Sequence, residues 1–353
     1  MLIFYLIILG LFSVYSFALV DPNFTLINHS LWEWFRNLMV NLGYYQRGWS
    51  TGIFLTFIAF LSFFNWYFWK KGKQPVKLAF LIAAVTLLAY PFLSHDFFNY
   101  LFDAKILTFY GQNPYLHKAL DFPADPWLRF MHWTHRTYPY GPVFLLLTLV
   151  PSFLSFGKLV LAYLFFKLLF ALFYVMAVWV TDKFNRRAAL FFATSPLVIV
   201  EGLVNNHNDF LGVALFLLAL YFWHQKKQVI KAIFFGLSSF GIKYVTLAAL
   251  PLFKKSSYMV WLSLALATGI FGYIYTQIGI HPWYLLNLLV LLPFLRCYSS
   301  SFLVLSSGLL ISYYPYLLYG PWDEAWKVTL KEQIIWVTLL LFFLTLWLTN
   351  RKK

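Results

Sequence analysis

Long apolar segments alternate with short polar loops along the whole chain of 353 residues. Many of these segments reach about 17 residues or more, enough for an α-helix to cross a hydrocarbon core of about 30 Å. Residues 1–20 lack the basic start and the cleavage site of a signal peptide, so we expect a retained first helix there. Further crossings are expected near residues 51–69, 77–93, 158–180, 188–204, 209–223, 257–275, 283–296, 299–312 and 333–349.

The charge of the loops sets the expected orientation, because short loops rich in Lys and Arg mark the cytoplasmic side. If all the basic loops are cytoplasmic, residues 94–140 are external and residues 143–156, broken by Pro151, lie along the outer membrane face. Residues 230–253 must then form two half-helices that meet near Gly241 and Lys243. The basic loops are residues 70–77, 182–187, 224–228, 253–255 and 350–353.

This pattern predicts an all-α polytopic membrane protein with about twelve transmembrane helices. Residues 1–353 are expected to form a single transmembrane domain in the cell membrane, with both termini cytoplasmic. Residues 94–157 are expected to be the large external catalytic loop, with helices that lie parallel to the membrane. The acidic residues were not used to build this topology, and only Asp182 of the 12 falls on the cytoplasmic side.

The composition supports a membrane protein and argues against nucleic acid as a partner. Hydrophobic residues make up 61% of the chain and charged residues only 11%, against roughly a quarter in soluble domains. The net charge of +15 lies mainly in loops that face anionic lipid, so we expect membrane lipids and no nucleic acid as partners. The single cysteine, Cys297, excludes an intramolecular disulfide. The sequence contains no glycine-rich or Walker phosphate motif.

The first large external loop carries a group of polar residues. Its stretch SHDFFNYLFDAKILTFYGQNPY, residues 94–115, is expected to form a helix that Ser94 caps. The opposite face of this helix is apolar and can lie on lipid or protein. One alternative is an interfacial helix whose carboxylates are simply solvated. The residues that share its polar face at helical spacing are Asp96, Asn99, Tyr100 and Asp103.

Four further polar groups are expected in the same compartment. Ordinary alternatives exist for them, since aromatic residues anchor membrane surfaces and NNHND is also a plausible polar turn. Lys243 is harder to explain in this way, because an ammonium group in an apolar hairpin needs an anionic partner. Lys167, in the middle of a crossing, either snorkels or pairs with a lipid phosphate. The four groups are HWTHRTYPYG (132–141, with Arg136 and Tyr138), NNHND (205–209), Lys243 and HPWY (281–284).

Taken in order, these motifs resemble the GT-C superfamily of polytopic glycosyltransferases, which use sugars linked to polyprenyl or dolichyl phosphate. Their order and spacing are most like the lipid-phosphomannose-dependent mannosyltransferases. Residues 1–76 depart from the simplest family plan, in which the acidic loop follows the first helix. The motifs that carry the resemblance are HDFFNYLFDAKILTFYGQNPY, TYPYGP, FGK, SPLVIVEGLVNNHND, GIKYVTLAALP and HPWY.

The resemblance implies a catalytic base at Asp96, with Asp103 as the second candidate, which takes the proton of the acceptor hydroxyl. His281 is expected either to assist the base or to touch the donor phosphate. A base without an enzyme nucleophile implies direct displacement with inversion. The departing phosphate needs nearby positive charge, for which the candidates are Lys243, Arg136 and Lys167. The expected sugar- and acceptor-binding residues are Asn99, Tyr100, Tyr138, Asn205, His207, Asp209, Trp283 and Tyr284.

The expected partners are a polyprenyl-phosphate-linked sugar donor and a glycan or glycolipid acceptor, and the resemblance implies that the sugar is mannose. No cofactor or metal is implied, because the DxD pair of the related oligosaccharyltransferases does not occur in the sequence. Transfer of another sugar stays open, and so does a lipid or small-molecule transporter or flippase. The transporter is disfavoured because the acids lie outside the expected hydrocarbon layer and no internal repeat is evident. A full crossing at residues 230–255 would move HPWY to the cytoplasmic side.

Overall fold

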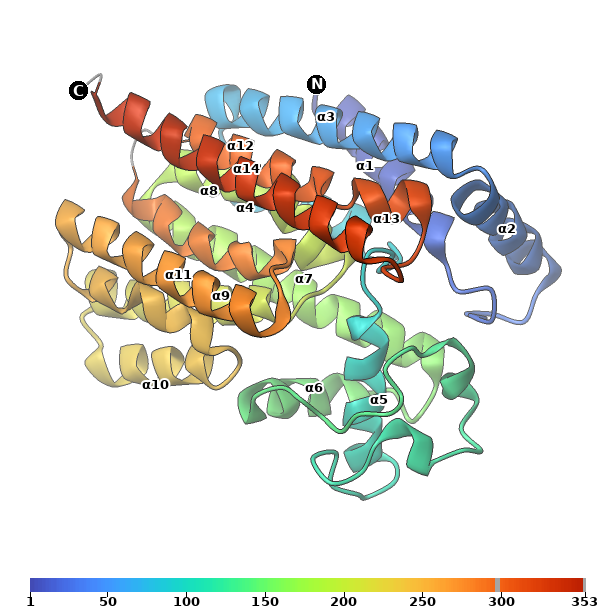
Figure 1. Ribbon diagram of the computed structural model, residues 1–353. Coiled ribbons are helices and arrows are strands. Elements are labelled where there is room, and N and C mark those ends of the chain that lie inside the picture. The colour runs from blue at the N-terminus through green and yellow to red at the C-terminus, as the bar shows by residue number, and fades with distance from the viewer. Residues whose placement is uncertain (296–298, 352–353) are drawn as a thin grey trace.

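The computed structural model describes residues 1–295 and 299–351, and within these ranges the chain is helical and contains no strand. The prediction of an all-α chain is therefore confirmed. Cys297 and residues 352–353 of the basic terminal segment lie outside the described residues. Long helices form one bundle, and α5, α6 and the loops between them form a smaller group at one corner of it (Figure 1).

Six helical segments of the described residues are long and apolar enough to cross a membrane. A seventh is obtained if α8 (Arg186–Thr194) and η5 (Val198–Val204), which meet at 64°, count as one broken span. The multi-pass prediction is thus supported, whereas the expected number of about twelve crossings is not confirmed. The six segments are α1 (Leu2–Tyr15) with η1 (Ser16–Leu19), α3 (Arg47–Lys71), α7 (Leu159–Phe184), α11 (Ser257–Ile278), α12 (Ser299–Ile311) with α13 (Tyr314–Tyr319), and α14 (Ala325–Arg351).

The difference arises because several expected crossings are short or tightly wound. Helix α4 (Pro75–Thr86) has 12 residues, which gives a length of about 18 Å. The 3₁₀ helix η8 (Pro282–Phe294) has 13 residues, but its rise of ~2.0 Å per residue extends it to about 26 Å. The remaining elements are α2 (Ser30–Val40), η2 (Asn41–Tyr45), α5 (Asp96–Thr108), η3 (Ala119–Asp121), η4 (Pro126–Phe130), α6 (Pro142–Leu154), α9 (Asp209–Tyr221), η6 (Phe222–Lys226), α10 (Val229–Phe240) and η7 (Tyr244–Phe253).

Two predicted breaks in apolar segments are present. Helices α10 and η7 are separate and meet at residues 241–243, as the half-helix prediction requires. Helix α6 is likewise separate from α7, and Gly157 between them has a φ of +72°, which favours glycine. Pro151 does not break α6, however, because the helix continues through it to Leu154.

The basic loops gather at one end of the bundle. Residues 73–77 line a surface hollow together with Arg186, so the first two basic loops are neighbours. Phe184 packs edge-on against His224 at 6.3 Å between ring centroids, and the His224 Nε2 lies 2.8 Å from the Leu252 carbonyl oxygen. The loops near residues 184, 224 and 253 therefore meet as well, which agrees with the charge-based topology.

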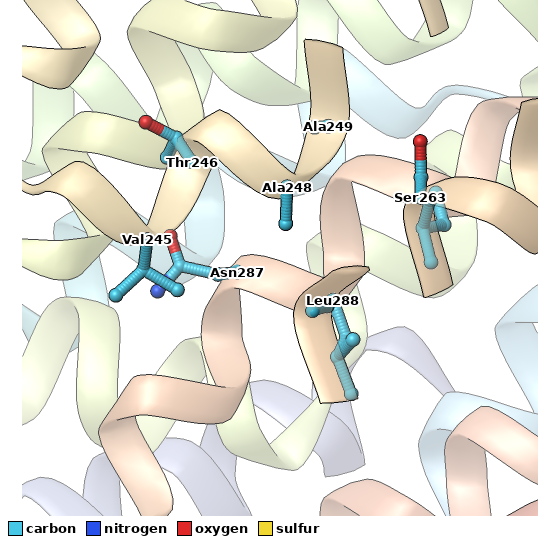
Figure 2. Close-up of a pocket in the computed structure, with 9 residues that line it drawn as sticks. Val245, Thr246, Ala248, Ala249, Ser263, Asn287 and Leu288 are labelled. Carbon is cyan, nitrogen blue, oxygen red and sulfur yellow. The ribbon is translucent and has the colours of Figure 1, made fainter. Parts of the chain in front are cut away.

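A small cavity lies between η7, α11 and η8, and Figure 2 shows the side chains that surround it. Its volume is about 10 Å³, which is close to the room that one water molecule needs. Ser263 and Asn287 line it, and the Ser263 Oγ and Asn287 Oδ1 atoms are buried without hydrogen-bond partners among the described residues. The cavity suits a water molecule and is too small for a sugar.

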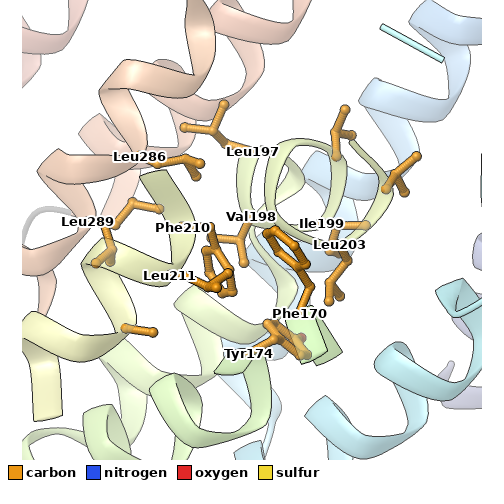
Figure 3. Close-up of a cluster of buried hydrophobic side chains, with 14 of the residues drawn as sticks. Phe170, Tyr174, Leu197, Val198, Ile199, Leu203, Phe210, Leu211, Leu286 and Leu289 are labelled. Carbon is orange, nitrogen blue, oxygen red and sulfur yellow. The ribbon is translucent and has the colours of Figure 1, made fainter. Parts of the chain in front are cut away.

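Helix α9 is the centre of the core, because every residue of Asp209–Tyr221 is buried. A helix that is apolar all round is typical of such a central position. It contacts α7, α10, η7 and η8. In Figure 3, Phe210 and Leu211 of α9 lie among Phe170 and Tyr174 of α7, with side chains of η5 and η8 beside them. This packing fixes the start of α9, where Asp209 lies.

Candidate functional site

Helix α5 places the first predicted carboxylate. The Ser94 Oγ accepts the N–H of Asp96 at 3.2 Å, and Asp96 lies in the first helical turn, where the helix dipole favours a negative charge. The residues from Phe97 to Ile106 are all buried. Phe97 packs edge-on against Tyr163 of α7 at 5.4 Å. The apolar face of α5 therefore lies on protein, and the interpretation as an exposed interfacial helix is wrong.

Asp96 lies between a cation and an imidazole. Its Oδ1 is 3.5 Å from the Nη2 of Arg136, and its Oδ2 is 3.9 Å from the Nδ1 of His207. The Asp96 side chain is 18% exposed, whereas that of His207 is 1% exposed. Asp96 is consequently accessible to a substrate, and His207 supports it from the protein interior.

The loop that carries Arg136 is held by backbone contacts. The Asn99 Nδ2 donates to the Trp133 carbonyl at 3.0 Å, and the Arg136 guanidinium lies 5.0 Å from the centre of the Trp133 ring. The N–H of Tyr138 donates to the Pro114 carbonyl at 2.9 Å, which joins this loop to the end of the opening stretch. Asn99 thus positions the Arg136 loop.

Gly141 brings this loop against the turn between α10 and η7. A Cβ at Gly141 would lie 2.0 Å from the Gly241 carbonyl oxygen, so only glycine permits this approach. The same carbonyl accepts the N–H of Val143 at 3.2 Å. The TYPYG segment and the turn before Lys243 therefore form one unit, although they are far apart in the sequence.

The NNHND turn follows the π-helical segment η5, a form that is frequent at functional sites. Asn206 reverses the chain with a φ of 58°, a conformation that asparagine tolerates better than most residues. The Asn205 Oδ1 accepts the N–H of Leu93 at 3.3 Å, and its Nδ2 donates to the Glu201 Oε2 at 3.0 Å. Asn205 is fully buried and fixes the turn from inside.

Glu201 is a site residue that the sequence reasoning missed. Its side chain is fully buried, and its Oε2 is 3.3 Å from the Nε2 of His207. His207 therefore lies between two carboxylates, Glu201 on the inner side and Asp96 on the outer side. The signal was available in SPLVIVEGLV, because a carboxylate within an apolar run must find a partner when it is buried.

Three aromatic rings form a stack beside Asp96. Trp283 lies between two imidazoles, with ring centroids 4.2 Å from His207 and 4.3 Å from His281 and interplanar angles of 13° in both cases. The HPWY motif at the start of η8 is thereby joined to NNHND. Trp283 and His281 are only partly buried, so the outer part of the stack is open to a ligand.

The second predicted cation, Lys243, is paired within the protein. Its Nζ lies 2.9 Å from the Asp209 Oδ2, and it faces the Tyr284 ring at 4.9 Å from the centroid. The Asn287 Nδ2 donates to the other carboxylate oxygen of Asp209 at 3.1 Å. The anionic partner that the sequence required for Lys243 is therefore Asp209.

Four other predicted residues lie deeper. The Lys167 Nζ donates to the carbonyls of Leu203 and Val204 at 3.3 and 2.7 Å and is 2% exposed, so it neither snorkels nor reaches a lipid surface. The remaining three are Asp103, Tyr100 and Tyr138, whose side chains are buried. Burial raises the pKa of Asp103 to about 8, and the charge of Arg136 only partly opposes this shift.

The structure thus brings most of the predicted residues to one end of the bundle and leaves Lys167 apart. Among the residues that the structure describes, no group of three or more His, Cys, Asp or Glu side chains is arranged to hold a metal ion. The predicted residues that meet around the ring stack and its two neighbouring ion pairs are Asp96, Arg136, His207, Asp209, Lys243, His281, Trp283 and Tyr284.

This helical architecture is that of a multi-pass membrane protein, and a partly exposed carboxylate beside a cation and stacked rings is suited to acid–base chemistry. Residues 5–259 match the model of the MptA_B family, described as alpha-(1->6)-mannopyranosyltransferase, N-terminal domain. The chain belongs to this family and is a membrane mannosyltransferase of the GT-C type, so the predicted resemblance is confirmed. Comparison with curated proteins and with solved structures gave no match. HPWY and α14 lie beyond the matched residues.

Proposed function

We propose that this protein transfers mannose from a polyprenyl-phosphate-linked donor to a hydroxyl of a glycan or glycolipid on the extracytoplasmic face. The observation that carries this proposal is the position of Asp96, which is partly exposed and lies between Arg136 and His207. This site lies in the loops expected to be external, whereas the basic loops gather elsewhere. Both termini are cytoplasmic in this proposal.

The Asp96 carboxylate acts as the general base. It accepts the proton of the acceptor hydroxyl while the hydroxyl oxygen attacks the anomeric carbon of mannose. The bond between that carbon and the phosphate oxygen breaks, and the lipid phosphate leaves with the electron pair. Asp103 is less suited to this role, because a carboxyl group with a pKa of about 8 is largely protonated at neutral pH.

The residues around Asp96 supply binding and orientation. Both faces of the Trp283 ring are covered by imidazoles, so the partly exposed edge of the ring stack is the surface available to the sugar, and Tyr284 lies at the neighbouring ion pair. His207 and Asn205 are buried, so they act by positioning Trp283 and Asp96. Tyr100 and Tyr138 are also buried, and both pack edge-on against the Tyr140 ring, at 5.0 and 5.4 Å between centroids. They therefore support the loop that carries Arg136.

The stereochemistry gives the proposal a specific test. The family description names an alpha-(1->6) linkage, and a single displacement inverts the anomeric carbon. An α-linked product therefore requires a β-linked donor. We expect the purified, reconstituted full chain to transfer labelled mannose from β-linked polyprenyl phosphomannose to a mannoside acceptor and to leave the α-anomer unused.

Two controls make this experiment decisive. A nucleotide-linked mannose serves as the alternative donor, and linkage analysis of the product reports the configuration. Transfer from the nucleotide sugar without added lipid donor would contradict the proposal. Equal use of both lipid-linked anomers would contradict direct displacement while leaving the donor class intact.

The raised pKa of Asp103 predicts a pH-dependent stability. The folded state holds a proton on this carboxyl up to about pH 8, whereas the unfolded chain releases it near the ordinary aspartate pKa of 3.8. Stability therefore falls as the pH rises from about 4 to about 8, because the unfolded state binds fewer protons over this range. We expect Asp103→Asn to reduce this fall, with a higher Tm than the parent at pH 8–9 in micelles.

The matched control for this experiment is Asp121→Asn, in the exposed part of the same external loop. It should leave the dependence of Tm on pH unchanged. An unaltered pH dependence in Asp103→Asn would show that Asp103 is ionised in the folded protein at neutral pH.

A further inference from the structure

The C-terminal helix α14 carries a buried lysine that the function described so far does not use. Lys331 is 3% exposed and lies in the second turn of the helix. No hydrogen bond or ion pair joins its ammonium group to any described residue. The ammonium group faces the Trp322 ring at 5.4 Å from the centroid, and the Glu332 carboxylate acts on it only through space. A buried ammonium group without an anionic partner is costly, above all in a membrane segment.

The other buried lysines all have partners. One helical turn earlier, Lys327 pairs with Asp323 at 2.7 Å and with Glu324 at 3.0 Å. Lys105 pairs with Asp125, and Lys167 donates to two backbone carbonyls. Among the buried lysines of the described residues, Lys331 is therefore the one whose ammonium group has no hydrogen bond or ion pair. That group is available to bind an anion.

Lys331 lies beside the ring stack of the site. The segment before His281 packs on α14, because a Cβ at Gly279 would lie 2.9 Å from the Glu332 Oε1 and Tyr275 packs edge-on against Trp336 at 5.3 Å. This packing brings the helix turn that carries Lys331 close to His281. Burial, and after it the positive charge of Lys331, lower the pKa of His281 to about 3, which agrees with this arrangement.

We propose that Lys331, together with His281, binds the phosphate of the lipid-linked donor. This inference rests on the proposed function, and it moves the phosphate away from the cations that the sequence suggested. Lys243 is already paired with Asp209, Lys167 with carbonyls, and Arg136 lies beside Asp96. Lys331 makes no direct ion pair with the nearby Glu332 carboxylate, so its ammonium group is available to bond a phosphodiester anion.

The direction of the reaction agrees with this assignment. In a direct displacement, the attacking hydroxyl and the departing phosphate lie on opposite sides of the anomeric carbon. The base Asp96 lies at the His207 end of the ring stack, and Lys331 lies at the His281 end. A mannose at the exposed edge of the stack would have its acceptor at the His207 end and its phosphate at the His281 end.

The test compares binding of polyprenyl phosphate with binding of the uncharged polyprenol by the full chain in micelles. We expect Lys331→Met to weaken polyprenyl phosphate binding by about tenfold or more, because a hydrogen bond to a charged group is lost. Polyprenol binding should stay as in the parent, and Lys331→Arg should keep most of the phosphate affinity. Glu332→Gln, the next residue of the helix, is the matched control and should not weaken binding.

Several outcomes separate this inference from the proposed function. Unchanged polyprenyl phosphate affinity in Lys331→Met, with mannose transfer intact, would overturn the role of Lys331 and leave the proposed function standing. Lysine-dependent binding without transfer from any lipid-linked mannose would support the phosphate site and count against the proposed function. Equal competition by phosphatidylglycerol would assign the charge to ordinary membrane lipid and overturn the inference. If Lys331→Met does not fold, Lys331→Gln takes its place in the same comparison.

Discussion

Replacement of Asp96 by asparagine is expected to lower kcat for mannose transfer by about 10²–10⁴-fold, the usual contribution of a general base. The amide has nearly the same shape as the carboxylate but does not accept the acceptor's proton. The contact with Arg136 at 3.5 Å is partly exposed, so its loss should cost little stability. The KM for the donor and the Tm should therefore stay close to those of the parent. Initial rates with labelled polyprenyl phosphomannose, at saturating donor, measure the effect.

Asp103→Asn is the natural comparison for this variant, since both carboxylates lie on α5. It should keep transfer within a few-fold of the parent at neutral pH, because Asp103 is largely protonated there already. The reverse result, with Asp96→Asn active and Asp103→Asn inactive, would move the base to Asp103. Loss of activity in both variants at normal Tm would indicate that the two carboxyl groups act as a pair.

The parts of the fold that depend on local sequence could be predicted. Ser94 before an acidic first turn marks the start of α5, and Gly241 beside Lys243 marks the break between α10 and η7. Ser94 accepts the N–H of Asp96, although the N-cap position itself is taken by His95 and not by Ser94 as expected. Gly241 has an ordinary helical φ of −68° and is needed for close packing, because a Cβ there would lie 2.4 Å from the Val143 Cγ2. The basic loops also cluster as their charge suggested. The number of crossings could be predicted less well, because the hydropathy of a segment does not show whether it forms an α-helix or, like η8, a 3₁₀ helix.

The site was predictable as a set of residue types but not as a set of pairs. Asp209, Lys243 and His281 were all identified from the sequence, yet their neighbours come from separate elements. The contact of Gly141 with Gly241 and the burial of Glu201 under His207 follow from tertiary packing. Lys331 shows the limit most clearly. From the sequence alone, a lysine near the start of a helix is expected to be solvated. Lys327 and Lys331 are both buried, and only the absence of an ion pair distinguishes Lys331 from Lys327.

Removal of the Lys243 ammonium group is expected to cause a large loss of stability. The Asp209 carboxylate is fully buried, whereas Lys243 is 19% exposed. Lys243→Met would therefore leave an unpaired charge in the core, at a cost of about 3 kcal/mol, the lower end of the range for breaking a buried pair. Asp209→Asn should cost less, because the remaining ammonium group can turn towards solvent and Asn287 can still bond to the amide.

The double variant Lys243→Met/Asp209→Asn separates pairing from packing. It should be more stable than Lys243→Met alone, because the charge that lacked a partner is gone. Unfolding of the full chain in micelles, followed as a function of denaturant, gives the four free energies that the cycle needs. Additive effects of the two substitutions would mean that the ion pair contributes no coupling energy. In that case the free charge of Lys243 would compete with Lys331 as a ligand of the donor phosphate.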